Sequence, residues 1–168
     1  MFDEDDHRPD PLREALEKPL RAQAETIAHL ARALITCLPD AAERTADESD
    51  DGSDETLEGL LAENVKSYVL ENAYLLGAKL ANACGSTDFG HRYEMAVLIK
   101  RAACELQTQV SFLASLAHGA VPAEYVAALR AEVEEFRRLF VPWVAAFDPT
   151  DHYDDGWGLF GRLLPPQP

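Results

Sequence analysis

Apolar residues recur at spacings of three and four from about Leu60 to Phe147, almost without interruption. This period matches the 3.6 residues per turn of an α-helix and leaves little of the chain for strands. Ala, Leu and Glu, which favour helix, dominate the composition, and β-branched residues are few. The sequence therefore predicts an all-α chain, and 168 residues suffice for one domain with one flexible segment.

The periodic apolar residues form four stripes, over residues 16–38, 57–83, 95–117 and 125–147. Two prolines lie inside the stripes. Because a mid-helix proline costs about 3 kcal/mol, we expect the continuous first helix to begin at Pro19, as a first-turn residue. Pro142 is expected to kink or end the last helix near Val141 for the same reason.

Short connections predict how the helices are arranged. Gly85 is expected to stop the second helix in a left-handed conformation, and one of the polar residues Ser86–Asp88 to cap the third helix. Pro122 is expected to open the fourth. Because helices joined by so few residues pack as antiparallel neighbours, we predict an antiparallel up-and-down four-helix bundle over residues 19–147.

Acidic residues are concentrated outside this helical body. Residues 1–58 hold 17 acids against 6 bases, residues 59–118 hold five of each, and residues 119–168 hold 8 acids against 4 bases. The tract 39–58 contains nine acids and one base. Self-repulsion and few apolar residues predict a mobile acidic loop over residues 39–53 and a partly disordered acidic segment over residues 1–18.

The C-terminal tail, residues 148–168, is rich in Gly and Pro yet carries aromatic side chains. We expect it either to fold back over one end of the bundle or to dock on another chain.

The charge and hydropathy of the chain exclude two classes of partner. The formal net charge of −15 repels phosphate, so no direct nucleic-acid binding is expected. No apolar run approaches the roughly 18 residues that span a bilayer, and the acidic N-terminus is unlike a signal peptide. We therefore expect no membrane association and a cytoplasmic location.

The sequence contains no recognisable catalytic or metal motif. Cys37, Cys84 and Cys104 form no CxxC pair, which argues against a disulfide framework or structural zinc, and each is expected to be a small buried thiol. No Glu-x-x-His lies in the four apolar stripes, no GxGxxG follows a predicted strand, and no P-loop or serine elbow occurs. We therefore expect no catalytic residue, no cofactor and no metal site.

Asn72 is the one strongly polar residue that falls on an apolar stripe. As a buried amide, it could fix helix register by pairing across the bundle, or it could form part of a small polar pocket. The spacing alone leaves both alternatives open.

The stretch Glu63–Trp143 resembles the four helix bundle protein family, which includes proteins encoded in intervening sequences of bacterial large-subunit ribosomal RNA genes. The resemblance rests on the segment Ala102–Val110 (AACELQTQV), on the turn from Gly119 into Pro122–Tyr125, and on the acidic-then-arginine run Leu129–Leu139. It implies an up-and-down bundle, assembly as a ring-shaped pentamer and no known enzymatic activity. Family members are often basic and some are linked to nucleic acid, whereas the matched body here is neutral and its flanks acidic.

Three functional hypotheses follow. The first is a non-enzymatic helical scaffold that self-associates and binds a protein partner through the neutral face of the second and third helices. The second is an acidic regulator, resembling an antitoxin or a DNA mimic, that acts through residues 39–58. The third is an enzyme or metal protein with a site in the bundle core. The candidate partner contacts are acidic and aromatic residues, namely Asp47, Glu48, Asp50, Asp51, Asp54, Glu55, Trp157 and Phe160.

Overall fold

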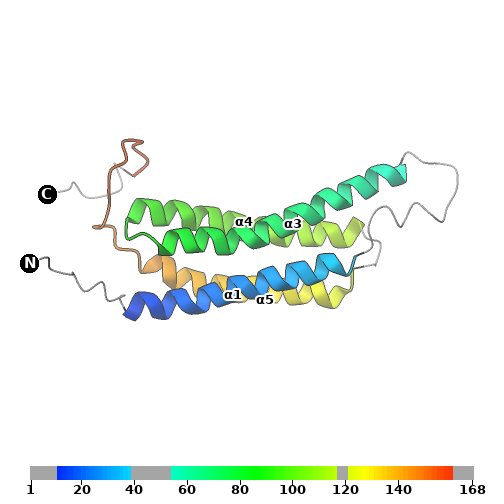
Figure 1. Cartoon of the computed structure of the whole chain (residues 1–168), viewed down its shortest axis with the longest axis horizontal. Helices are drawn as coiled ribbons and strands as arrows, with labels where there is room; N and C mark the ends of the chain where they lie inside the picture. Colours follow the sequence, from blue (N-terminus) through cyan, green and yellow to red (C-terminus); the bar gives the residue numbers. More distant parts are fainter. Residues whose placement is uncertain (1–10, 39–53, 117–120, 161–168) are drawn as a thin grey trace, which may run out of the picture.

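The computed structural model describes residues 11–38, 54–116 and 121–160 (Figure 1). Within these ranges the regular structure consists of four helices, α1 (Pro11–Thr36), α3 (Asp54–Cys84), α4 (Phe89–Leu116) and α5 (Ala123–Ala145), and no strand. The predicted all-α four-helix bundle is confirmed. The predicted acidic loop 39–53 lies outside the described residues.

Each helix packs against two others. α3 packs closely against α1 and α4, and α5 also packs against α1 and α4, whereas the backbones of the diagonal pairs do not come as close within the described ranges. Following the colours of Figure 1, α1 and α4 run in one direction and α3 and α5 in the other. The largest interface joins α3 to α4, and the smallest joins α4 to α5. Helices adjacent in sequence are therefore adjacent in space.

One apolar core fills the centre of this four-helix arrangement. Its largest fully buried side chains are Trp143, Phe136, Leu20, Ile27, Leu34, Leu76, Leu80, Ile99, Leu106, Leu113, Val69 and Val110. Every helix contributes, and the buried residues follow the spacing of three and four. Because each such side chain stabilises the fold by about 1.5–3 kcal/mol, this core is the main source of stability.

The expectation that the first helix begins at Pro19 was wrong, because α1 starts at Pro11 and continues through Pro19. Pro19 has no N–H, so the Ala15 carbonyl lacks its usual helical hydrogen bond. Both residues are exposed, and water can donate to that carbonyl instead. The turns before Pro19 are also held from outside the helix, because Arg13 and Glu17 make polar contacts with other elements.

Pro142 likewise does not end its helix, since α5 extends three residues beyond it to Ala145. Pro142 is exposed, as is Arg138 one turn earlier, so the unpaired carbonyl there also lies at the solvent side. The next amide after the helix, that of Ala146, bonds the Pro142 carbonyl at 3.2 Å.

The turn between α3 and α4 lies at the predicted residues, but Gly85 does not adopt the predicted left-handed conformation. The α3 helix ends just before Gly85, whose φ is not positive. The bonds from its N–H to the carbonyls of Ala81 and Asn82, both 3.1 Å, complete the last turn without a left-handed residue. Asp88 caps α4, because its Oδ1 accepts the His91 N–H at 2.7 Å.

The described part of the C-terminal tail folds back on the first turn of α4. The Phe89 N–H donates to the Asp151 carbonyl, and the Tyr153 N–H donates to Asp88 Oδ2, both at 2.6 Å. The ring of Phe160 packs edge-on against the ring of Phe89, with centroids 6.2 Å apart. The aromatic tail therefore covers one end of the bundle, on its own chain.

Within the described ranges, no helix is both long enough and apolar enough to cross a membrane.

Candidate functional site

The outer side of the α3–α4 pair carries a pocket of about 390 Å³. Both helices line it over three turns or more, with Tyr68, Glu71, Asn72, Leu75 and Lys79 from α3 and Leu98, Arg101, Ala102, Glu105 and Gln109 from α4. The pocket is a shallow, mixed surface, in which apolar and polar side chains alternate along the seam between two helices.

Asn72 lies at the inner wall of this pocket. It is only 6% exposed, and its Nδ2 donates to Gln109 Oε1 at 2.9 Å. The pair links α3 to α4 at one register, and the same two amides line the pocket. The structure thus gives Asn72 both of the surroundings that the sequence left open, a cross-helix partner and a polar pocket.

Large apolar side chains gather on the exposed surface of α3 and α4. Of the fourteen exposed large hydrophobic residues in the described ranges, nine belong to these two helices: Leu57, Leu60, Leu61, Tyr68, Tyr74, Tyr93, Val97, Leu98 and Phe112. Tyr68, which lines the pocket, precedes Asn72 by one turn, and Phe112 follows Gln109 by one turn, so both aromatics lie along the same seam. Apolar clusters on a surface are typical of protein–protein contact sites.

Two of the four charged side chains that line this pocket are paired with each other. Arg101 Nε lies 2.7 Å from Glu105 Oε1, one turn further along α4. An exposed pair of this kind contributes little to stability. Glu71 and Lys79 also line the pocket, so a partner on this face meets apolar, amide and charged groups together. We call the surface formed by Tyr68, Leu75, Leu98 and Phe112 around the Asn72–Gln109 pair the α3–α4 face.

The acidic candidate contacts lie almost wholly outside the described residues. Asp47, Glu48, Asp50 and Asp51 fall in the undescribed range 39–53. Asp54 and Glu55 lie in the first turn of α3, where their side chains are not described. The structure therefore leaves the role of the acidic tract a prediction.

The two aromatic candidates of the tail have different surroundings. Trp157 is 83% exposed. Phe160 is half-buried and packs against Phe89, Tyr93 and His152 of its own chain. Of the pair, only Trp157 presents its ring to solvent.

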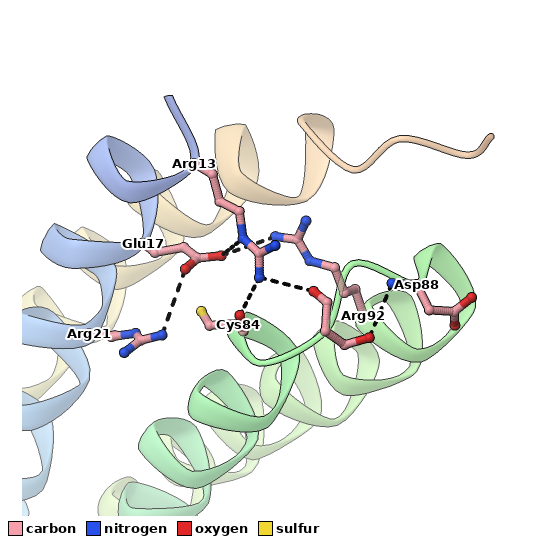
Figure 2. A network of polar contacts seen from close by, with 7 residues as sticks. Arg13, Glu17, Arg21, Cys84, Asp88 and Arg92 are labelled. Carbon is pink, nitrogen blue, oxygen red and sulfur yellow. Dashed lines mark hydrogen bonds and ion pairs between the residues drawn. The ribbon is translucent and has the colours of Figure 1, made fainter. Parts of the chain in front are cut away.

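A cluster of charged residues lies at the end of the bundle where α1 and α4 begin (Figure 2). Glu17 is its centre. Glu17 Oε1 lies 2.8 Å from Arg13 Nε and 3.4 Å from Arg92 Nη2, and Oε2 lies 3.7 Å from Arg21 Nη2. Both Glu17 and Arg92 are 8% exposed, so this is a buried ion pair that joins α1 to α4. We call it the Glu17 cluster.

Arg13 extends the Glu17 cluster to the end of α3. Its Nη2 donates to the Cys84 carbonyl and, at 3.0 Å, to the Ser86 carbonyl. Carbonyls at a helix C-terminus lack helical partners and carry partial negative charge. A guanidinium there both donates hydrogen bonds to these carbonyls and is attracted by their charge. The first turns of α1 are thereby fastened to the α3–α4 turn.

Burial sets the electrostatics of the Glu17 cluster. Desolvation, followed by the neighbouring Arg13 charge, lowers the pKa of Arg92. The Arg92 guanidinium also lies 4.2 Å from the centroid of the Phe147 ring, in a cation–π contact. Burial raises the pKa of the Cys84 thiol, although nearby Arg21 opposes this effect. A raised thiol pKa disfavours the thiolate, which is the reactive form of cysteine.

Few features of the sequence indicated the Glu17 cluster. Glu17 precedes Pro19, where no continuous helix was expected, and Arg92 is 75 residues away in the chain. The one available signal was the register of α1, because Glu17 shares a helix face with Leu20, Ala24 and Ile27, at spacings of three, seven and ten. Reading the stripe from residue 16 as one continuous helix through Pro19 would have placed Glu17 on the buried face.

The prediction that all three cysteines are buried was wrong for two of them. Cys84 is buried, whereas Cys37 and Cys104 are exposed. Cys104 lies on the outer side of α4 and Cys37 just beyond the last turn of α1, so neither follows the apolar stripe of its helix. Within the described ranges, no group of three or more His, Cys, Asp or Glu side chains is placed to hold a metal ion.

Comparisons of the chain with protein-family models, with curated proteins and with solved structures found no match. The resemblance of Glu63–Trp143 to the four helix bundle protein family therefore stays a prediction.

Proposed function

We propose that this chain is a cytoplasmic, non-enzymatic helical scaffold that self-associates and binds protein through the α3–α4 face. The observation that carries the proposal is the number of exposed apolar side chains on these two helices, nine of the fourteen in the described ranges, of which Tyr68, Leu98 and Phe112 lie on the face itself. Charge supports it as well, since residues 59–118 hold five acids and five bases while the flanks are acidic. Interface cores are depleted of charge, so the neutral helices are the favourable ones to bury.

The architecture supports the same choice. The α3–α4 interface is the most extensive in the bundle, so the two helices present one firm surface. The buried Asn72–Gln109 bond holds their register. A surface that is preorganised in this way loses little conformational entropy when it binds.

Size-exclusion chromatography with light scattering tests the proposal. Tyr68 and Val141 are nearly equally exposed, at 53% and 56%, but Val141 lies on α5. We expect the wild type to form an oligomer at micromolar concentration, Tyr68→Glu to shift it to monomer, and Val141→Glu to leave it intact. A strictly monomeric wild type would remove self-association from the account, and the mass of an oligomer would tell a dimer from the pentamer that the family resemblance implies.

A deletion separates this proposal from the acidic-regulator hypothesis. Removing residues 41–52 takes out five acids and leaves the α3–α4 face unchanged. If the scaffold proposal is correct, the deletion variant captures the same partners as the wild type, whereas Tyr68→Glu loses them. The reverse pattern would support the acidic tract as the functional part.

A further inference from the structure

A second pocket, of about 240 Å³, lies beside the Glu17 cluster, far from the α3–α4 face. Its lining comes from α1, α4, α5 and the segments that flank them, with Leu12, Arg13, Leu16, Thr87, Arg92, Trp143, Ala146, Asp148 and Asp151. Neither the scaffold proposal nor the fold requires a pocket at this position.

Two residues of this lining, Arg92 and Trp143, each have a buried donor without a partner. Within the described ranges, Arg92 Nε and Trp143 Nε1 make no hydrogen bond. Arg92 is 8% exposed and Trp143 is 1% exposed. Buried N–H groups are rarely left unpaired, because desolvating them without a partner costs free energy. Both groups donate only, so the missing partner is a hydrogen-bond acceptor.

The charges of the pocket favour an acceptor with a single negative charge. Two guanidiniums of the lining, those of Arg13 and Arg92, share the one carboxylate of Glu17. Asp148 and Asp151 also line the pocket, but both are exposed, and Asp148 Oδ1 already accepts from Thr150. Positive charge therefore prevails at the buried side and negative charge at the exposed side, which would repel a dianion such as phosphate.

The remaining wall is apolar. Leu12, Leu16 and Ala146 line it together with the Trp143 ring. Pockets of this kind orient a ligand with a few polar groups and bury the rest of its surface against apolar side chains. We propose that the pocket binds a small organic monocarboxylate, whose oxygens accept from Arg92 Nε and Trp143 Nε1 and whose carbon chain lies against Leu12 and Leu16.

The two tryptophans of the chain supply a reporter and an internal control. Trp143 carries the unpaired N–H, whereas Trp157 is 83% exposed and is absent from the pocket lining. We expect butyrate, titrated into the full chain, to move the Trp143 indole signal in a ¹H–¹⁵N NMR spectrum along a saturable curve, with a Kd on the order of 1 mM. The Trp157 signal should stay in place, and Trp157→Phe assigns the two peaks.

Matched variants and ligands test the chemistry of the site. Arg92→Lys keeps a charge opposite Glu17 but lacks Nε, and we expect it to weaken butyrate binding about tenfold. Arg138→Lys, on the exposed surface of α5, should leave the Kd unchanged. Butanol, which has the carbon chain without the carboxylate, and inorganic phosphate should not saturate the Trp143 shift.

Two results would overturn the proposal, both read on the wild type and therefore independent of whether a variant folds. One is an unmoved Trp143 signal at 50-fold the expected Kd. The other is an equal shift with butanol or phosphate, which would mean simple filling of an apolar space or general attraction of anions. Neither result would bear on self-association through the α3–α4 face.

Discussion

Replacing Glu17 by Gln is expected to destabilise the bundle far more than a matched substitution at the surface. The change removes the only carboxylate that contacts the buried Arg92 guanidinium at the start of α4 in the described structure. Glu17 and Arg92 have side-chain exposures of 11% and 9%, so water cannot replace the lost partner. Breaking a buried pair by removing one member typically costs 3–5 kcal/mol. Because the amide of Gln can still accept one hydrogen bond, we expect a loss of about 2–3 kcal/mol.

Urea unfolding followed by circular dichroism measures this loss. With a slope of about 2 kcal/mol per molar urea, the midpoint should fall by roughly 1–1.5 M. Glu134→Gln is the matched control, because Glu134 also pairs with an arginine, Arg137, but on the exposed face of α5. It should leave the midpoint unchanged. Equal midpoints for the Glu17 and Glu134 variants would refute the claim that the buried cluster fastens α1 to the bundle.

Three further predictions concern buried polar groups. A thiol reagent should label Cys37 and Cys104 at once and Cys84 only on unfolding. Equal labelling rates for the three thiols would contradict the burial of Cys84 at the end of α3. Because the folded pKa of Cys84 is raised above its ordinary value of 9.0, the unfolded chain loses this proton first, so stability should fall as pH rises above about 9. Cys84→Ala should show a shallower fall between pH 8 and 10.5, and identical slopes would exclude this thiol as a cause. Asn72→Ala should lower the free energy of unfolding in urea by about 1 kcal/mol. The double variant Asn72→Ala/Gln109→Ala should lose less stability than the sum of the two single variants, whereas strict additivity would mean that the pair does not couple α3 to α4.

The helices could be predicted from the sequence because burial of apolar side chains decides them. The stripe on α4, for example, is the buried set Ile99, Ala102, Leu106, Val110 and Leu113. Local cap chemistry was equally readable, since Asp88 accepts the N–H three residues later. These features depend on residues a few positions apart, and a single sequence contains that information directly.

The start of α1 could not be predicted, because it depends on contacts across the chain. Local propensity disfavours a helix through Pro19, yet the contacts of Arg13 with the carbonyls that follow α3, and of Glu17 with Arg92, hold the two turns before it. Such partners are more than 70 residues apart, and no pattern in one sequence pairs them. Tertiary contacts have overridden the helix propensity here.

The candidate sites were predicted unevenly. Asn72 was found because a polar residue on an apolar stripe is conspicuous. Its partner Gln109 was not found, because Gln109 does not lie on the apolar stripe of its helix. The pocket beside Arg92 was missed because it needs side chains from three helices in one place. The acidic residues of the 39–53 range, by contrast, are visible only in the sequence.

The central claim, that the α3–α4 face is the interface, is tested most directly by hydroxyl-radical footprinting over a range of protein concentrations. Tyr68 and Phe112 on the face are 53% and 44% exposed, and Tyr153 in the tail is 75% exposed. We expect oxidation of Tyr68 and Phe112 to fall as the concentration rises through the association range, while that of Tyr153 stays constant. Oxidation of Tyr68 and Phe112 that does not change while the protein oligomerises would contradict the account.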